Sequence, residues 1–348
     1  MRARGGVRGA TGLGGWLRAR GWCAVVVAVV VGGMPLVTAA HAPAVVRYRV
    51  TRTIPVGDGP SGVAVDSAAR TVYVANLGDG HSDPSDSTVS VIDAATGTVT
   101  GTIPVGHGSD ALAVDPAART LYVANESDGT VSVIDAATGT VTGTIPVGSD
   151  PMGVAVDPVT RTVYVANFGG GVSVIDAATG TVTGTIRVGG GPVAVAVDPA
   201  AGAVYAADYF AGTVWVIDAA TGTVTRVIPV GSFPYGVAVD SAAGTVYVAN
   251  SGDNTVSVID AATGTVTRTI PVGRYPTGVA VDPAARTVYV ANRDAGTVSV
   301  IDGATGTVTA TVPVGTSPYG VAVAPVTHTA YVTNVSGNTV SVISRCRC

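Results

Sequence analysis

Side chains that could bind a metal ion are gathered in two short segments of the chain. They are Asp79, His81, Asp83, Asp86, His107 and Asp110. Carboxylate and imidazole groups are common ligands of divalent metal ions. However, their spacing does not match an EF-hand calcium loop, and a flexible acidic loop is usually just solvated. We therefore expect no cofactor, and a divalent metal ion held by these residues is the alternative.

The sequence contains no other motif of a known catalytic mechanism. It has no G-x-S-x-G elbow, no H-E-x-x-H zinc motif and no C-x-x-C-H haem attachment site, and a chain without lysine has no P-loop. The segment 106–110 contains Ser, His and Asp, but the members of a triad normally come from separate segments. We therefore expect a protein without catalytic residues.

The elements that position these residues belong to a repeated unit. A tetrad similar to Ile-Pro-Val-Gly begins at Ile54, Ile103, Ile145, Ile186, Ile228, Ile270 and Val312. Each unit contains four short segments of alternating Val, Ile, Thr and Tyr, which is typical of β-strands. Turn sequences such as Asp-Pro-Ala-Ala-Arg and Ala-Ala-Thr-Gly separate them. Four antiparallel strands per unit predict one propeller blade, whereas a parallel β-helix would have shorter coils without hairpins.

The two ends of the repeat region favour a closed ring. The last unit stops after its third strand, near Ile343, while Val46 to Val56 supplies a fourth strand before the first unit begins. Pairing of these strands would leave no open edge. The sequence therefore predicts an all-β fold, a seven-bladed β-propeller over residues 43–344. Residues 345–348, with Cys346 and Cys348, form a C-terminal tail in this interpretation.

Residues 1–42 have the pattern of a secretory signal peptide. Five arginines precede the apolar stretch Cys23 to Leu36, which is followed by the small residues around Ala40. An uncleaved membrane anchor is the alternative, because Cys23 to Ala40 just reaches the length that spans a bilayer. We expect a secreted or cell-surface protein that contacts a membrane only through such an anchor.

The charge of the chain argues against a nucleic-acid partner. The formal net charge is -4, all basic residues are arginine, and no basic run occurs outside the N-terminus. The hydrophobic content of 47% likewise excludes a disordered chain.

Repetition within one chain separates scaffold from site, because a single site rarely needs seven equivalent copies. Two aspartates recur per unit and are expected to bond the backbone N–H groups of turns. They are Asp66, Asp115, Asp157, Asp198, Asp240 and Asp282 after the first strand, and Asp93, Asp135, Asp176, Asp218, Asp260 and Asp302 after the third. The recurring tyrosines, such as Tyr73, are expected to pack between blades. The Asn that ends the second strand also recurs and is interpreted as scaffold.

Antiparallel connectivity places all sequence variation at one end of the ring. The loop before the first strand and the loop between the second and third strands share that end, which we call the variable end. The remaining acids fall there, namely Asp58, Asp79, Asp83, Asp86, Asp110, Glu126, Asp128, Asp150, Asp208, Asp253 and Asp294. The non-repeated aromatic residues fall there too. Loops that merely tolerate change would explain the acids, but large aromatic side chains in loops tend to mark contact surfaces.

The chain resembles the YVTN-type β-propeller repeat family. Tyr331-Val332-Thr333-Asn334 matches the family name literally, and other units read Tyr-Val-Ala-Asn from Tyr73, Tyr122, Tyr164, Tyr247 and Tyr289. The resemblance covers residues 46–344 and implies a propeller of an exported or cell-surface protein. Similar seven-bladed propellers include lactonases and lyases as well as binding scaffolds, so the fold does not assign an activity.

These observations favour a binding or interaction module whose ligand lies on the variable end. The expected ligand is a protein, a peptide or a carbohydrate, and the candidate binding residues are Phe168, Tyr209, Phe210, Phe233, Tyr235, Arg274, Tyr275, Arg293 and Tyr319. Two alternatives remain open. One is a metal-assisted hydrolase or lyase of the lactonase or streptogramin-lyase type, and the other is a structural envelope protein.

Overall fold

The computed structural model describes residues 46–78 and 86–347. The expected signal segment 1–42 and Cys348 lie outside the described residues. Within the described part of the chain, no helix has the length and apolar character needed to cross a membrane.

The described residues form 28 β-strands in seven four-stranded antiparallel sheets. Blade one consists of β2 (Pro60–Asp66), β3 (Thr71–Asn76), β4 (Thr88–Asp93) and β5 (Thr98–Pro104), and blade two of β6 (Ser109–Asp115), β7 (Thr120–Asn125), β8 (Thr130–Asp135) and β9 (Thr140–Pro146). Blade three consists of β10 (Pro151–Asp157), β11 (Thr162–Asn167), β12 (Val172–Asp176) and β13 (Thr181–Ile186), and blade four of β14 (Pro192–Asp198), β15 (Ala203–Asp208), β16 (Thr213–Asp218) and β17 (Val224–Pro229).

Blade five consists of β18 (Pro234–Asp240), β19 (Thr245–Asn250), β20 (Thr255–Asp260) and β21 (Thr265–Pro271), and blade six of β22 (Pro276–Asp282), β23 (Thr287–Asn292), β24 (Thr297–Asp302) and β25 (Thr307–Pro313). Blade seven consists of β26 (Pro318–Ala324), β27 (Thr329–Asn334), β28 (Thr339–Arg347) and the N-terminal β1 (Val46–Pro55). Two single-turn 3-10 helices, η2 (Arg293–Ala295) and η3 (Val335–Gly337), follow β23 and β27.

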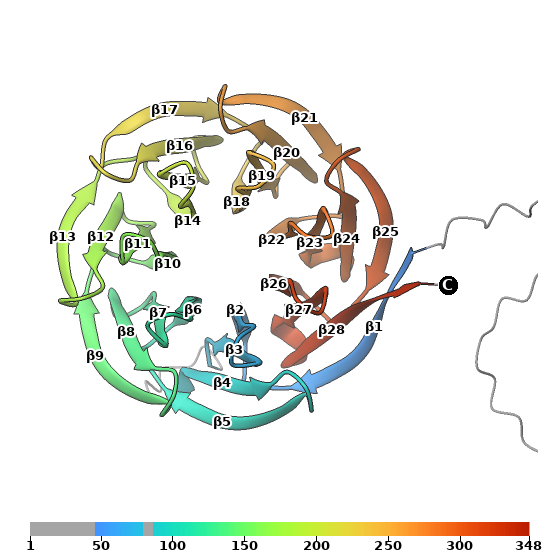
Figure 1. The fold of residues 1–348 in the computed structure, drawn as a ribbon, viewed down its shortest axis with the longest axis horizontal. Helices are drawn as coiled ribbons and strands as arrows, with labels where there is room; N and C mark the ends of the chain where they lie inside the picture. The colour runs from blue at the N-terminus through green and yellow to red at the C-terminus, as the bar shows by residue number, and fades with distance from the viewer. Residues whose placement is uncertain (1–45, 79–85, 348) are drawn as a thin grey trace, which may run out of the picture. The chain divides into compact units, whose positions relative to one another are not determined.

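Residues 48–346 form the ring that the repeat predicted (Figure 1). The first strand of each blade lies nearest the central axis and the fourth strand forms the rim, as β2 and β5 do in blade one. The seven-bladed propeller fold is therefore confirmed. The last strand, β28, runs three residues beyond the predicted boundary at 344.

The turns between strands form because an aspartate at the start of each turn accepts hydrogen bonds from backbone N–H groups that have no carbonyl partner. In the turn between the third and fourth strands of blade one, Asp93 Oδ1 accepts hydrogen bonds from the N–H groups of Ala95 at 2.9 Å and Thr96 at 2.7 Å. Gly97 then adopts a φ of 65°, in the left-handed region that glycine tolerates best. Because blades two to six repeat nearly this sequence, they repeat the turn.

The hydrophobic core lies between neighbouring blades. One cluster joins Tyr73, Val89 and Ile103 of blade one to Leu121 and Ile134 of blade two, among other buried residues. Equivalent clusters join the remaining blades around the ring. A blade therefore buries its apolar faces only when both neighbours are present.

The N-terminal strand closes the ring. β1 pairs with β28, so the fourth strand of blade seven comes from the opposite end of the sequence. Ile54 of β1 is 3% exposed and belongs to the cluster between blades seven and one, whereas Tyr48 and Val50 pack in the cluster between blades six and seven. The closure expected from the two ends of the repeat region is confirmed.

Shortening β1 should destabilise the whole ring. We expect a chain that starts at Val56 to have a lower thermal unfolding midpoint than one that starts at Val46, because blade seven then lacks a strand. We expect Ile54→Ala to lower the free energy of unfolding by about 2–5 kcal/mol, as for other buried Ile residues. Circular dichroism during heating measures both changes.

The matched control is Val227→Ala, since Val227 lies on the fourth strand of blade four and is 45% exposed. It should change the free energy by less than about 0.5 kcal/mol. Equal midpoints for the two truncated chains would show that β1 does not close the ring.

Candidate functional site

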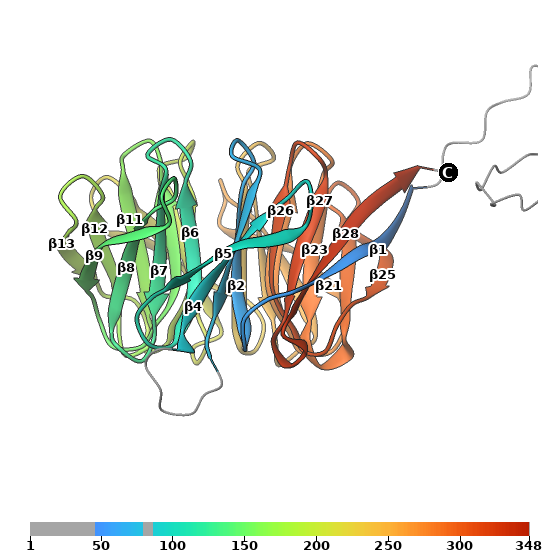
Figure 2. The same ribbon diagram turned by 90° about the horizontal axis from the view of Figure 1, so that it is seen from below.

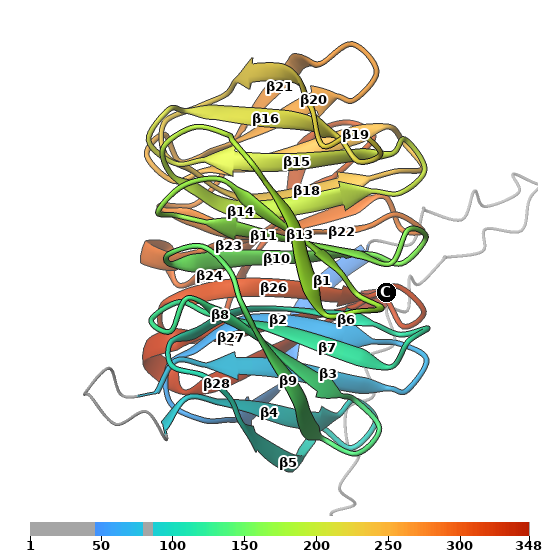
Figure 3. The same ribbon diagram turned by 90° about the vertical axis from the view of Figure 1, so that its left-hand side faces the viewer.

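The loops of the ring gather at two ends, as Figures 2 and 3 show. At the variable end, the N–H of Glu126 in the loop between β7 and β8 donates to Gly108 O, before β6, at 2.8 Å. At the other end, the N–H of Ala136 donates to Arg119 O at 2.8 Å. The same pairs of loops meet in the other blades, which confirms the predicted division into a variable end and a repeated end.

The recurring polar residues are scaffold, as predicted. Asn250, at the end of the second strand of blade five, donates to Ser257 Oγ at 2.9 Å and accepts from the N–H of Gly231 at 3.1 Å. Asn250 is fully buried, and Asn167 and Asn334 make the same pair of bonds in their blades. These amides tie the loop before the first strand to the second and third strands.

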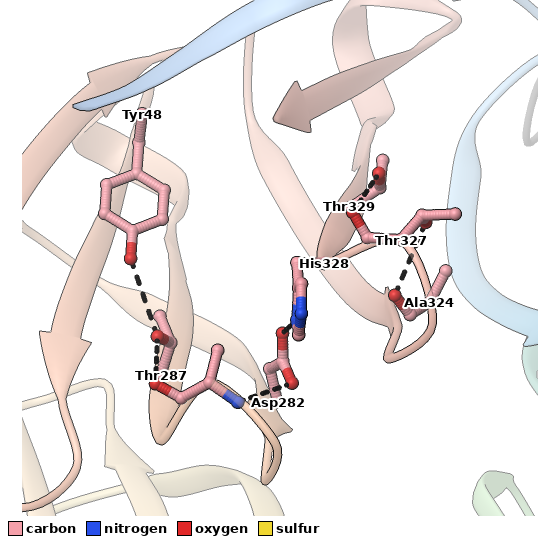
Figure 4. A network of polar contacts seen from close by, with 8 residues as sticks. Tyr48, Asp282, Thr287, Ala324, Thr327, His328 and Thr329 are labelled. Carbon is pink, nitrogen blue, oxygen red and sulfur yellow. Dashed lines mark hydrogen bonds and ion pairs between the residues drawn. The ribbon is translucent and has the colours of Figure 1, made fainter. Parts of the chain in front are cut away.

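The recurring tyrosines connect neighbouring blades. Tyr73 donates its hydroxyl to Ala136 O of the next blade at 3.4 Å, and Tyr164 reaches Ala219 O at 3.3 Å. At the repeated end of blades six and seven, His328 contacts the buried Asp282 at 2.7 Å (Figure 4). His328 thus lies at the end opposite to His107 and Asp110.

Six predicted binding residues form one connected group of rings, which we call the aromatic cluster. Its members are Phe168, Tyr209, Phe210, Phe233, Tyr235 and Tyr319. Tyr209 is its centre, with ring centroids 5.4 Å from Phe210, 4.9 Å from Phe233 and 6.1 Å from Tyr235. Phe168 extends it by a 5.2 Å contact with Phe210. Side chains from blades three, four, five and seven therefore meet on the variable end.

The other three predicted binding residues gather in blade six. Arg293 lies over the ring of Tyr275 at 5.8 Å, and Arg274 donates to the main-chain carbonyl of Asp294 at 3.2 Å. The Tyr275 hydroxyl raises the pKa of Tyr209, which links this group to the aromatic cluster.

A pocket of about 400 Å³ lies between Phe210 of blade four and Phe233 of blade five. Asp253 and Ser232 also line it. Phe210 is 64% exposed and Phe233 is 45% exposed. Three other pockets lie at the repeated end, each against a recurring tyrosine and the turn of the following blade. Because most of their lining residues recur from blade to blade, we assign the shape of these three pockets to the scaffold. Among these four pockets, only the one between the phenylalanines lies at the variable end.

Phe233 and Tyr275 occupy a strained backbone position. Both have φ near 52°, in the left-handed region, where blades one and two have Gly59 and Gly108. An L-residue other than glycine pays about 1–2 kcal/mol there. Asp150 and Ser317 adopt the same conformation at the equivalent position of blades three and seven, and turns at the repeated end hold arginines in it, for example Arg70, so the conformation alone does not mark a site.

Blade four differs most from the others in its sequence. Asp208 replaces the recurring Asn and Trp215 replaces the recurring Ser. Asp208 Oδ1 accepts from the N–H groups of Phe210 and Ala211, each at 3.2 Å, and so holds the loop that carries Phe210. Trp215 packs in the cluster between blades three and four. Its Nε1 and Asp208 Oδ2 are buried without a hydrogen-bond partner among the described residues.

A set of seven equivalent positions near the axis was missed by the sequence reasoning. In every blade the first strand has a register shift just after its first residue, as in a β-bulge. Such bulges redirect a side chain. The residues there, which we call the axial positions, are Ser61, Asp110, Met152, Val193, Tyr235, Thr277 and Tyr319. Alignment of the seven repeats would have found them, since they vary beside a nearly constant Gly-Val-Ala-Val.

The inner strands approach one another closely at these positions. A Cβ atom on Gly320 would collide with Ser61 O of the next blade, and one on Gly278 would collide with Tyr319 O. Side chains at the axial positions therefore converge. Tyr235 and Tyr319 come from blades five and seven, yet their hydroxyl groups hydrogen-bond each other. The two rings thus meet past the intervening strand β22.

Asp110 is the acidic residue among the axial positions. It is 6% exposed, and the Ser61 hydroxyl, which donates to the main-chain carbonyl of Asp110 at 2.6 Å, also lowers the pKa of its carboxyl group by hydrogen bonding. Burial raises the pKa of Asp110 to about 7, and the nearby Glu126 raises it further. Burial and the charge of Asp110 in turn raise the pKa of Tyr235 and that of Tyr319. The Asp110 carboxyl group therefore lies close enough to Tyr235 and Tyr319 for its charge to affect the pKa of both.

The candidate metal ligands are only partly covered by the structure. Asp79, His81 and Asp83 lie outside the described residues. Asp86 is exposed, His107 is half-buried and Asp110 is buried. Within residues 46–78 and 86–347, no three His, Cys, Asp or Glu side chains form a group that could hold a metal ion. The expectation about a metal therefore stays a prediction.

Comparisons with known proteins support assignment to the β-propeller proteins. A family model described as YNCE-like beta-propeller matches residues 236–345, in blades five to seven, and one described as outer membrane protein assembly factor BamB matches residues 58–227, in blades one to four. Each matches less than half of the chain. A search of curated proteins found no match.

Similarity to solved structures is extensive. The hydrazine synthase of Kuenenia stuttgartiensis has a TM-score of 0.73 and 25% sequence identity, with 90% of this chain and 99% of that chain covered. In all, 1706 chains of solved structures match, so the fold alone does not select a function.

Asp110→Asn should stabilise the protein at alkaline pH. The folded-state pKa is about 7 against an ordinary value of 3.8, so the wild-type protein loses stability as pH rises between these values. Above pH 7 the asparagine variant should gain at most about 4 kcal/mol, and below pH 4 almost nothing. Denaturant unfolding at pH 4 and pH 8 measures the difference. The same stability change at both values would contradict a raised pKa.

Proposed function

We propose that this protein is an exported binding module that recognises its ligand with the aromatic cluster at the variable end. The observation that carries the proposal is the convergence of six non-repeated aromatic residues from four different blades at the variable end. Large apolar side chains exposed together are typical of contact sites. The recurring aspartates, asparagines and tyrosines, in contrast, serve the scaffold.

The pocket between Phe210 and Phe233 supports this function. Aromatic rings with a carboxylate at the pocket wall suit a sugar ring or a peptide side chain, because the rings supply apolar area and Asp253 accepts hydrogen bonds. Phe233 keeps its aromatic side chain despite a backbone conformation that glycine would adopt without strain. The proposal includes no catalytic step.

Export and the repeat family belong to the same proposal. The basic and apolar N-terminal sequence, the single Tyr-Val-Thr-Asn at Tyr331 and the similar Tyr-Val-Ala-Asn of five other units support an extracytoplasmic protein of the YVTN type. The match to a family described as an outer membrane protein assembly factor is consistent with a protein partner, although that description concerns the family and not this chain.

A double substitution in the pocket tests the binding function. We expect Phe210→Ser with Phe233→Ser to weaken the ligands selected by wild-type protein from a peptide-display library or a glycan array at least about tenfold, since buried aromatic contacts dominate such interfaces. Biolayer interferometry measures the affinity, and circular dichroism verifies the fold.

The matched control replaces exposed apolar residues at the repeated end. Val159 is 74% exposed and Val326 is 81% exposed, so Val159→Ser with Val326→Ser changes surface polarity equally without touching the pocket. Binding that survives the pocket substitutions would contradict the proposal. A chelator-induced fall in the unfolding midpoint would favour the metal-assisted hydrolase or lyase instead.

A further inference from the structure

We propose that the cleft between blades seven and one, at the repeated end, binds a carboxylic acid with an aliphatic chain. This cleft, which we call the closure cleft, has a volume of about 440 Å³ and lies where β1 closes the ring. Arg52 and Arg70 line it, and none of the described residues that line it is acidic. The site lies at the end opposite to the aromatic cluster, so it goes beyond the function proposed above.

Other neighbouring blades place an acid opposite a base at the repeated end. The aspartate that ends the first strand meets the turn between the first and second strands of the next blade, as Asp282 contacts His328 at 2.7 Å (Figure 4). The same two positions hold an aspartate and an arginine at three further contacts between blades. These pairs are Asp66 with Arg119, Asp115 with Arg161 and Asp240 with Arg286.

The contact between blades seven and one keeps the base but lacks the acid. Ala324 occupies the position of the aspartate, and Arg70 occupies the position of the base. Ser344 likewise replaces the aspartate that ends the third strand of the other six blades. No described residue forms an ion pair with Arg70. A carboxylate supplied by a ligand would take the place of the missing side chain.

Asp93 of blade one does not fill that place. Hydrogen bonds from Thr96 lower the pKa of Asp93, and the charge of Arg70 lowers it further. However, its Oδ1 atom accepts from the N–H groups of Ala95 and Thr96 and from the Thr96 hydroxyl, so this carboxylate serves its own turn. Asp93 is not among the residues that line the closure cleft.

The balance of charge at the closure cleft favours an anion. Arg52 of β1 donates to Thr96 O in the turn of blade one. Burial raises the pKa of Tyr331 in this cleft, whereas Arg52 lowers it. At the equivalent contact between blades five and six, burial raises the pKa of Tyr247 and Asp240 raises it further. The closure cleft is therefore the more positive of the two.

The remaining lining of the closure cleft suits an aliphatic chain. Ile54, Val65 and Val342 form its apolar part, and the hydroxyl groups of Thr51 and Ser344 hydrogen-bond each other at 3.2 Å beside it. Arginine binds carboxylates with two parallel hydrogen bonds, and apolar walls favour a hydrocarbon chain. An inorganic anion would leave the apolar part uncovered, and an alkane would leave the arginines without a partner.

Calorimetric titration with octanoate tests this site. Octylammonium and 1-octanol are the cationic and uncharged controls of equal chain length, and acetate is the control without a chain. We expect octanoate to bind the wild-type protein and each control to bind at least about fivefold more weakly, because only octanoate combines the charge with the chain. This comparison uses wild-type protein, so it holds even if a variant fails to fold.

A pair of arginine variants locates the site. Arg70→Gln should weaken octanoate at least about fivefold, because the carboxylate loses its charged partner. The matched control is Arg161→Gln, at the same turn position of blade three, where φ is 58° against 55° at Arg70 and where Asp115 holds the opposite position. This control should leave the affinity within about twofold, since Arg161 lies at a different contact between blades.

Ala324→Asp tests whether the missing acid creates the site. The variant restores the residue of the other six blades, and its side chain can bond the N–H groups of its turn, as Asp66 bonds Ala68 and Ala69. We expect it to fold and to weaken octanoate at least about fivefold, because its carboxylate takes the place of the ligand. Ala324→Asn fills the same space without charge and should weaken octanoate less. Circular dichroism verifies the fold of both variants.

Three outcomes would overturn the proposal. The first is that octanoate does not bind, or binds no more tightly than octylammonium and 1-octanol. The second is that Arg70→Gln and Ala324→Asp both leave octanoate affinity unchanged. The third is that octanoate binding is lost in Phe210→Ser with Phe233→Ser but not in Arg70→Gln, which would place octanoate at the variable end.

Discussion

Apolar contact between neighbouring blades is the interaction on which the rest of this structure depends. Each sheet is covered on its faces only by the next blades, as the clusters that join Tyr73 to Leu121 or Tyr205 to Val246 illustrate. A single blade would expose these faces to water, so stability requires that all seven pack together. The pairing of β1 with β28 completes blade seven, so that this blade too covers both of its neighbours.

The polar residues of this ring fall into two groups, those that recur in the blades and those that vary. The aspartates, asparagines and tyrosines that recur are used locally, either in turns or between adjacent blades, and they leave the repeated end nearly uniform. Asn250 and Asp93 are examples, because every hydrogen bond described for them holds a loop to its own blade. At the variable end the recurring asparagines hold the loops in place, so the other side chains of those loops can vary without loss of the fold.

The bulges at the inner strands connect this scaffold to the candidate site. They place one side chain per blade at an axial position, and close backbone contacts at Gly278 and Gly320 bring these positions together. Asp110 thereby loses most of its hydration while it gains two tyrosines as neighbours. The variable end therefore contains a buried carboxyl group with a raised pKa in addition to its exposed acids.

The amino-acid sequence by itself determined the blade, the number of blades, the closing strand, the scaffold residues and the end that varies. These features follow from strand alternation and turn chemistry, which act within about 42 residues and repeat. Tertiary structure alone decided which variable residues meet. Tyr235 and Tyr319 are 84 residues apart and hydrogen-bond only because ring curvature and two bulges aim them at each other. Asp110, grouped by sequence with the candidate metal ligands, also acts electrostatically on those tyrosines, because burial near the axis depends on all the blades at once.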